Sequence, residues 1–245
     1  MEAPPNNAFP PTRWSLLSRI RNGDSNESRK ALNDLCQQYY YPLYCFIRRR
    51  GLEHHDAQDV LHEFLAKLLR NESFNDLTAS AGRLRGFLST GIQRFLVNWH
   101  RDHAKERLEI SMEAEQEQRE AEGRFQKEKL TDAETPEHVF ERKWAHELLR
   151  NVLRQLEAAY KAKNKLPLFQ ALRPAILSGG SLRGEDPDKI AAKLGMAPGS
   201  LRVAMKRLLE DYRDMLRSEV AQTVDSAEEV DDELAYLMSV FQRKK

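Results

Sequence analysis

The sequence has few of the residues that cross-link or turn a chain. Only 2 cysteines occur in 245 residues, and 11 glycines with 10 prolines are few for a β protein with many turns. Cys36 and Cys45 lack the paired CxxC spacing of a zinc or redox site, and their neighbours are aromatic. We therefore expect two reduced, buried thiols rather than a metal or redox centre, in a fold dominated by helices.

Long apolar runs and an excess of one charge are also missing. No run approaches the roughly 18 to 20 consecutive apolar residues of a membrane span. The first residues lack the cationic and apolar regions of a secretory signal, so we expect a cytoplasmic protein without membrane contact. Lys and Arg number 39 against 38 Asp and Glu, a net charge of +1, so a basic surface must arise from segregation along the chain.

Apolar residues at spacings of three and four predict helices in the first half. The predicted elements are a short helical stretch from Trp14 to Ile20, then helices over Ser28–Arg50, Asp56–Arg70 and Arg83–Arg107, with a loop at 71–82. From Gly82 to Arg107 six Lys or Arg stand against two acids. Such a basic helix with aromatic residues suits single-stranded nucleic acid, although we assign Trp99 to the core rather than to a stacking surface.

The middle of the chain is acidic. From Ala104 to Glu141, twelve acids and six bases occur with almost no large apolar residues, which is typical of a solvated linker or a lone helix. The predicted fold class is therefore all-α, with two small helical domains joined by an acidic linker. The predicted segments are a leader at 1–11, a first domain at 12–108, a linker at 109–135, a second domain at 136–218 and an acidic extension at 219–245.

The second domain contains the most specific local pattern. A long helix is predicted from Pro136, with the apolar stripe Phe140, Trp144, Leu148, Val152, Leu156 and Tyr160. Another is predicted from Pro167 to a stop at Gly179-Gly180, and two shorter helices follow. Asp186 begins the first of these, Gly195 supplies a left-handed turn, and Pro198 begins the second, which continues to about Arg217. A small residue at Ala191 allows the two helices to approach, so the pattern predicts a helix-turn-helix.

The outward side of the second short helix is basic near its amino-terminal end, which is the part that a recognition helix inserts into the major groove. The candidate DNA contacts there are Ser200, Arg202, Val203, Lys206 and Arg207. The alternative is a plain helical hairpin with a solvated basic face. We favour the helix-turn-helix because the turn chemistry and the basic first half coincide.

Taken together, the two halves resemble bacterial RNA polymerase sigma factors of the extracytoplasmic-function type, especially a group expanded in planctomycetes and related bacteria. The resemblance runs from about Thr12 to Phe241 and depends on the order and spacing of its motifs. Those motifs are Thr12-Arg13-Trp14-Ser15-Leu16-Leu17, Leu35-Cys36-Gln37-Gln38-Tyr39-Tyr40-Tyr41-Pro42-Leu43-Tyr44, Asp56-Ala57-Gln58-Asp59-Val60, Thr135-Pro136-Glu137 and Lys189-Ile190-Ala191-Ala192-Lys193-Leu194-Gly195-Met196.

The resemblance implies a protein that binds core RNA polymerase and directs promoter recognition and transcription initiation, with no enzymatic activity and no cofactor or metal. It places Asp59, His62 and Glu63 on the clamp of the largest polymerase subunit, with His62 where the family usually has Gln. The flap of the second-largest subunit is a further expected partner.

Promoter DNA is the other implied partner. The loop at 71–82 is expected to capture a base of the −10 element, and the helix-turn-helix to read the −35 element. The implied −10 contacts are Arg85, Arg94, Asn98, Arg101 and Lys105.

The end of the chain is acidic again, with seven acids and no Lys or Arg from Glu219 to Phe241. We expect a solvated end. The alternative is a regulatory segment whose Leu234, Leu237, Met238 and Phe241 pack on a domain or partner while its acids mimic DNA phosphate. The resemblance also allows for an anti-sigma partner.

Two other classes of function would explain parts of the sequence. Metal-capable side chains gather at His54, His55, Asp59, His62 and Glu63, but a His-Asp phosphohydrolase needs a further upstream His, and Asp56 is better explained as a helix-start acid. No phosphate-binding Gly-rich loop or nucleophile elbow occurs, so catalysis is not expected.

The second alternative is a helix-turn-helix regulator that binds duplex DNA without polymerase. It would explain Pro187 to Arg217 but neither the basic helix over Arg83–Arg107 nor the acids on the helix over Asp56–Arg70.

Overall fold

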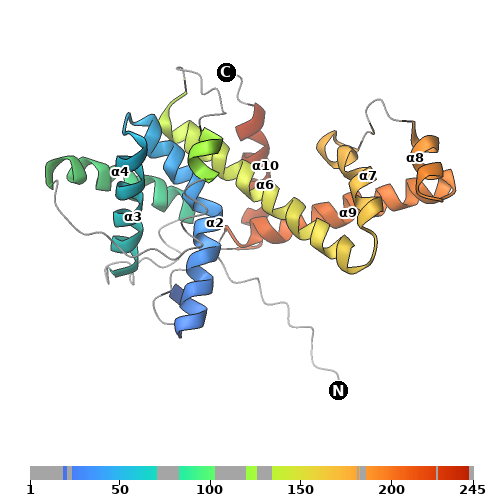
Figure 1. Cartoon of the computed structure of the whole chain (residues 1–245), viewed down its shortest axis with the longest axis horizontal. Helices are drawn as coiled ribbons and strands as arrows, with labels where there is room; N and C mark the ends of the chain where they lie inside the picture. Colours follow the sequence, from blue (N-terminus) through green and yellow to red (C-terminus); the bar gives the residue numbers. More distant parts are fainter. Residues whose placement is uncertain are drawn as a thin grey trace. The chain divides into compact units, whose positions relative to one another are not determined.

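The structure, a computed structural model, describes residues 19–20, 24–70, 83–102, 120–125, 134–180, 182, 186–224 and 226–242. All regular elements in these ranges are helices, which confirms the all-α expectation for them (Figure 1). The helices are α2 (Ser25–Arg49), α3 (His54–Arg70), α4 (Leu84–Asp102), α6 (Pro136–Ala162), α7 (Leu166–Leu177), α8 (Pro187–Lys193), α9 (Pro198–Ala221) and α10 (Glu229–Gln242). The predicted leader, the helical stretch beginning at Trp14 and the loop at 71–82 lie outside the described residues.

None of the helices in the described ranges is both long enough and apolar enough to cross a membrane. Both cysteines are free thiols. The expected burial is confirmed for Cys45 but not for Cys36, which is half-buried.

The chain divides into two compact units. One unit comprises Met1–Glu147 together with Val220–Lys245, and the other comprises Leu148–Glu219. The predicted domains divide the chain elsewhere, because they give all of α6 to the second domain and set the acidic extension apart. In the structure α6 and α9 each contribute residues to both units.

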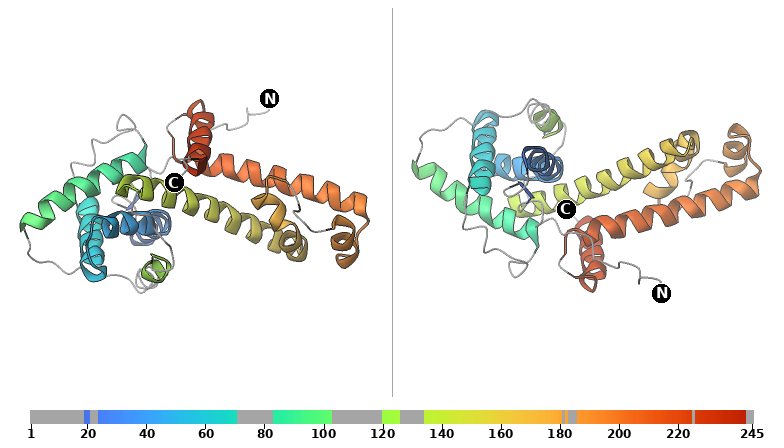
Figure 2. Two further views of the ribbon diagram at one scale, coloured as in Figure 1. Left: turned by 90° about the horizontal axis from the view of Figure 1, so that it is seen from above. Right: turned by 90° about the horizontal axis from the view of Figure 1, so that it is seen from below.

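In the first unit α3 packs against both α2 and α4 (Figure 2). Helix α2 begins three residues before its predicted start because the Asp24 carboxylate accepts hydrogen bonds from the backbone N–H groups of Asn26 and Glu27, at 2.9 and 2.8 Å. After α2, Gly51 adopts φ +91, the left-handed conformation expected of a helix-ending glycine. The core of this unit is aromatic and aliphatic, with Tyr39, Tyr44, Phe46, Leu61, Leu88 and Ile92 each at most 1% exposed.

Part of the predicted acidic linker packs on the first unit. Residues 120–125 are helical, and Ala121 is buried. The Glu122 carboxylate accepts a hydrogen bond from the Tyr44 hydroxyl and pairs with Arg48 at 3.1 Å. The Arg124 guanidinium lies 3.7 Å from the centroid of the Tyr41 ring. This stretch is therefore not a solvated linker, because α2 supplies partners for its charges.

The predicted apolar stripe of α6 is confirmed. Its buried members are Phe140, Trp144, Leu148, Val152, Leu156 and Tyr160. Pro136 is the first residue of this helix, as its fixed φ and missing N–H favour.

The expectation of a solvated C-terminal end is wrong for the described residues. Helix α10 forms there and buries Val230, Glu233, Leu237 and Val240. The alternative, a packed apolar stripe, is only partly right, because Met238 is 58% and Phe241 38% exposed. The residues that α10 buries therefore differ from those predicted, and they include the carboxylate of Glu233.

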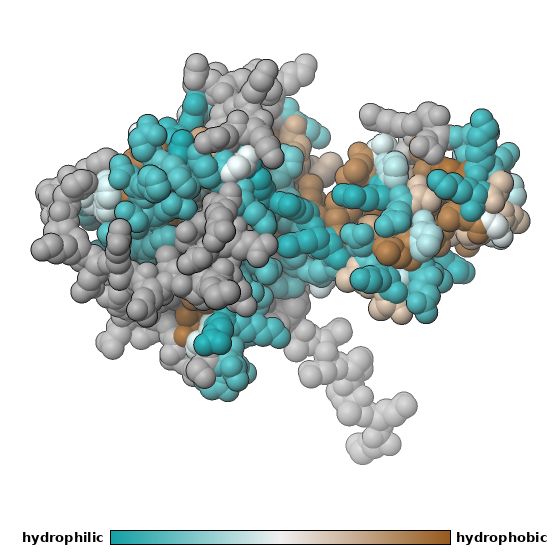
Figure 3. Space-filling model, viewed as in Figure 1, coloured by the Kyte–Doolittle hydropathy of each residue, from teal (hydrophilic) through white to brown (hydrophobic). Residues whose placement is uncertain are grey.

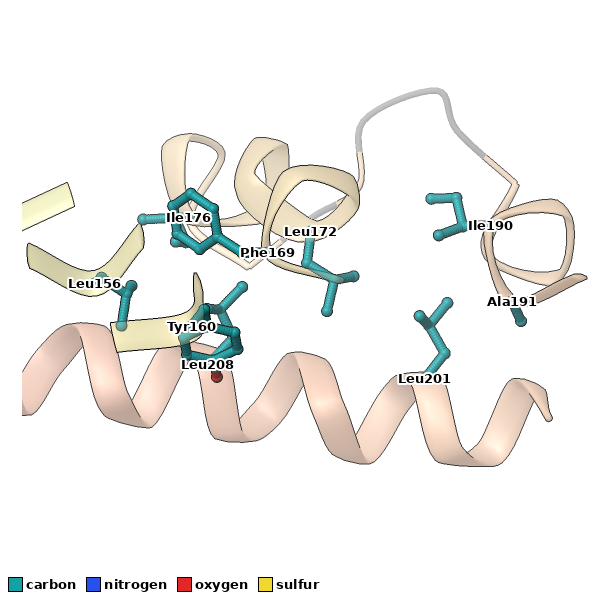
Figure 4. Close-up of a cluster of buried hydrophobic side chains, with 9 residues drawn as sticks. All are labelled: Leu156, Tyr160, Phe169, Leu172, Ile176, Ile190, Ala191, Leu201 and Leu208. Carbon is teal, nitrogen blue, oxygen red and sulfur yellow. The ribbon is translucent and has the colours of Figure 1, made fainter. Parts of the chain in front are cut away.

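The second unit packs α7, α8 and α9 around one apolar cluster with the end of α6 (Figure 4). The cluster consists of Leu156, Tyr160, Phe169, Leu172, Ile176, Ile190, Ala191, Leu201 and Leu208. Helix α7 ends before Gly179 and Gly180, whose φ values of +66 and +96 fit the predicted stop.

Candidate nucleic-acid interface

Helix α8 begins and ends through local hydrogen bonds that its sequence encodes. The Asp186 carboxylate accepts from the backbone N–H of Asp188 at 3.0 Å. At the other end Met196 N–H donates to the Ala191 carbonyl (2.9 Å), and Gly195 N–H donates to the Ala192 carbonyl (3.1 Å). Gly195 adopts φ +64, so this turn is a Schellman motif with glycine in the left-handed position.

The two helices joined by this turn share the apolar cluster of the second unit. Ala191 is completely buried, as its small size in the pattern predicted, and Leu201 and Leu208 of α9 are buried to within 1%. Because α9 presents these side chains inward every seven residues, its opposite side remains at the surface.

The five predicted DNA contacts on α9 are all exposed. They are Ser200, Arg202, Val203, Lys206 and Arg207. Lys206 lies 3.7 Å from Glu210, but both side chains are at least half exposed, and such a surface pair contributes little to stability. Val203 is 51% exposed, so the face combines cations with an apolar contact surface.

A concave surface of about 610 Å³ adjoins this face of α9. Its polar lining includes Lys165 and Arg207, and its apolar lining includes Leu168 and Val203. Apolar patches lie among hydrophilic side chains on the second unit in Figure 3. Helical periodicity does not predict this concavity, because Lys165 directly precedes α7 and Leu168 lies in its first turn, thirty or more residues before α9.

The predicted −10 contacts differ in how exposed their side chains are. Arg94 and Asn98 are exposed on α4, and Val97 between them is 72% exposed. Arg101 belongs to α4, although its side chain lies outside the described residues, and so does the whole of Lys105. Trp99, assigned to the core, is half-buried.

Arg85, an implied −10 contact, is not an exposed cation. Only 7% of Arg85 is exposed, and its guanidinium pairs with the carboxylate of Glu233 on α10. The guanidinium also lies 4.7 Å from the Trp144 ring centroid and 4.4 Å from that of Tyr236. Helical periodicity does not predict the burial of Arg85, because its carboxylate partner lies 148 residues further along the chain.

The three predicted polymerase contacts lie on α3 at positions i, i+3 and i+4, which share one side of a helix. Asp59 is exposed and Glu63 half-buried. His62 is half-buried with its Nε2 3.4 Å from the Tyr40 hydroxyl. Burial lowers the pKa of His62, and the nearby Asp59 carboxylate opposes that shift.

The metal-capable side chains near the start of α3 have other contacts. His54 Nδ1 lies 2.9 Å from the Tyr44 hydroxyl and 3.4 Å from the Glu122 carboxylate. Within the described ranges, no three His, Cys, Asp or Glu side chains come together in a group that would hold a metal ion. Asp56 lies in the first turn of α3, as expected for a helix-start acid.

No family model, curated protein or solved structure matches this chain. The described residues define an all-helical protein with a helix-turn-helix that exposes a basic helix face. The functional argument therefore depends on the geometry of these residues.

The turn at Gly195 provides a test of the helix-turn-helix geometry. Gly195→Ala should lower the free energy of unfolding by about 1–2 kcal/mol, because an added Cβ is strained in the left-handed region. An added Cβ meets no atom within 4 Å at this site, so steric crowding is not a factor. Urea denaturation followed by circular dichroism measures the change.

Gly199→Ala is the matched control. Its added Cβ also meets nothing within 4 Å, but its φ is not in the left-handed region. This variant should be as stable as the wild type or more stable, since Gly in a helix costs about 0.5–1 kcal/mol relative to Ala. Equal destabilisation by the two substitutions would contradict the assigned turn.

His62 generates a prediction on pH. Its folded-state pKa is below the ordinary value of 6.5, so on acidification the unfolded chain takes up a proton before the folded chain does. Stability from this group is therefore lost as pH falls through 6.5 towards the folded pKa. His62→Gln should lose less stability than the wild type over this interval, measured by urea denaturation at a series of pH values. Parallel losses in the two proteins would contradict the assigned environment.

Proposed function

We propose that this chain is an extracytoplasmic-function type sigma factor, which binds core RNA polymerase and directs it to promoters. The observation that carries the proposal is the basic face of α9, which stays at the surface because the opposite face of α9 shares an apolar cluster with α8. Arg202, Lys206 and Arg207 are exposed there within the first three turns of α9.

The geometry of α8 and α9 supports a role in duplex recognition. A recognition helix contacts base edges through its amino-terminal turns, while cations beside it contact phosphates. Arg202 can reach a guanine edge with two parallel hydrogen bonds, whereas Lys206 and Arg207 fit phosphate contacts. The exposed Val203 fits an apolar contact such as a thymine methyl group.

The first unit supports a second, separate role. Asp59 and Glu63 offer carboxylates from one side of α3, as a contact with a basic surface of polymerase requires. On α4 the exposed Arg94 and Asn98 suit the backbone and bases of a displaced strand. A protein that only bound duplex DNA through α9 would have no use for either surface.

In the proposed mechanism, polymerase supplies affinity and the two units supply sequence discrimination. The α9 face reads the −35 element while α4 contributes to the −10 region. Neither DNA surface alone provides many charges, so promoter binding should be strong only when both surfaces are presented on polymerase.

The proposal is tested by measuring DNA binding with and without core polymerase. The purified chain should bind promoter-length duplexes tightly only after addition of the core enzyme. Tight binding of the chain alone to palindromic duplexes would instead establish an autonomous helix-turn-helix regulator.

The basic face of α9 provides a prediction on salt dependence. In the complex with polymerase, Arg202→Gln or Lys206→Gln should weaken promoter binding by about tenfold. If the lost contact is to a phosphate, the slope of log affinity against log salt should become shallower by about 0.9.

Arg213→Gln is the matched control, because Arg213 is also exposed on α9 but lies beyond its first three turns. Its affinity and salt slope should equal those of the wild type. Similar losses for all three variants would indicate general electrostatic attraction rather than a recognition face.

The acidic side of α3 provides a prediction on polymerase binding. Glu63→Gln should weaken binding of the chain to core polymerase by about fivefold or more, since a charge-assisted contact contributes roughly 1 kcal/mol. Glu53→Gln, an equal charge change at an exposed residue just before α3, should have little effect. Fluorescence titration with core enzyme measures both, and equal effects would contradict the assigned surface.

A further inference from the structure

A buried ion pair joins the C-terminal helix to the first unit. Glu233 of α10 is 0% exposed, and its carboxylate pairs with Arg85 and, at 2.8 Å, with Arg83. Arg83 directly precedes α4 and Arg85 lies in its first turn. A carboxylate held by two guanidinium groups is bound as an external anion would be.

Most of this anion-binding arrangement is independent of α10. Arg83, Arg85 and Trp144 come from parts of the chain that precede α10, and the Trp144 ring lies under the Arg85 guanidinium. Helix α10 adds the carboxylate of Glu233 and the ring of Tyr236, whose centroid lies 4.4 Å from the guanidinium. Without α10, two cations and an aromatic ring would face the space that the carboxylate now fills.

The composition of α10 matches that of a helix that competes with nucleic acid. Its first turn contains Glu229, Asp231 and Asp232, and no Lys or Arg occurs from Glu219 to Phe241. Met238 is 58% exposed, so not every apolar residue of α10 is used in packing, whereas the Phe241 ring packs edge-on against His146 with their centroids 4.9 Å apart. Attachment of α10 therefore combines a limited apolar contact with one specific carboxylate.

Burial of this ion pair is not an efficient way to stabilise a fold. Two charges lose their hydration when they are buried, and a pair of apolar side chains of similar volume often stabilises a protein as well or better. Burial raises the pKa of Glu233, against the opposing effect of Arg85 and Arg83. Because stability alone does not require this pair, a switching role is the better explanation.

We propose that α10 is an autoinhibitory helix, in which Glu233 occupies a phosphate-binding site formed by Arg83 and Arg85 on the first unit. Release of α10 exposes both arginines to the sugar-phosphate backbone of single-stranded DNA. This proposal deepens the proposed function, on which it depends for its ligand. It gives Arg85 a DNA contact only in the open state, which reconciles its predicted role with its burial.

The test measures binding of the full-length chain, without polymerase, to poly(dT) over a range of salt concentrations. Glu233→Gln keeps the size of the side chain but removes its charge. It should raise affinity for poly(dT) by about tenfold and steepen the salt slope by about 1.4, since each new contact to a single-stranded phosphate contributes about 0.7.

Asp232→Asn is the matched control, because it makes the same charge change at an exposed neighbour on the same helix. It should leave the salt slope unchanged. Equal effects of the two substitutions would mean that only net charge matters and would overturn the proposal.

Two further variants separate release of α10 from misfolding. Tyr236→Ala removes the other α10 contact to Arg85 without a charge change, and it should reproduce the gain in affinity while circular dichroism shows retained helix. Adding Arg85→Gln to Glu233→Gln should abolish most of the gain. A gain that persists without Arg85, or Glu233→Gln and Tyr236→Ala proteins that both stay folded and show no gain, would overturn the proposal.

The outcome is distinguishable from failure of the sigma-factor proposal. A chain that does not bind core polymerase but whose Glu233→Gln variant gains affinity for poly(dT) retains the autoinhibitory contact and loses the wider function. A chain that binds polymerase but shows no gain in this variant retains the wider function and loses the autoinhibitory contact.

Discussion

The apolar cluster shared by α7, α8 and α9 is the constraint on which the proposed function depends. Ala191 has no side chain beyond Cβ to hold the helices apart, and Gly195 turns the chain where other residues would be strained. Leu201 and Leu208 face this cluster, so the cations on the opposite side of α9 face outward. The basic surface is thus a consequence of how the opposite face is buried.

The first unit is organised by charged residues that reach over long sequence distances. Glu122 contacts α2, and Glu233 contacts the start of α4, in both cases with arginine partners. Each pair fastens an acidic segment onto a helical core that has its own apolar interior. Acidic stretches that look solvated in composition therefore become parts of the folded unit.

The sequence predicted the elements whose signals are local. The stripe of α6, the stop at Gly179 and the cap at Asp186 each depend on residues within a few positions, and all are present in the structure. The exposed residues of α9 followed from the same periodicity, since the side opposite a buried stripe must be at the surface.

Features that depend on distant partners were not predictable in this way. The ion pair of Arg85 needs Glu233 of α10. The concavity beside α9 needs residues at the start of α7. The packing of residues 120–125 also depends on Tyr44 and Arg48, more than seventy residues earlier. In each case helical periodicity describes one element but not what packs on it.

The central claim is that the chain confers promoter specificity on polymerase. The most direct measurement is in vitro transcription by core RNA polymerase on a library of random promoter sequences, with and without the chain. The account predicts initiation at a defined pair of sequence elements only when the chain is present. Identical transcript populations with and without it, together with no detectable association with the core enzyme, would contradict the account.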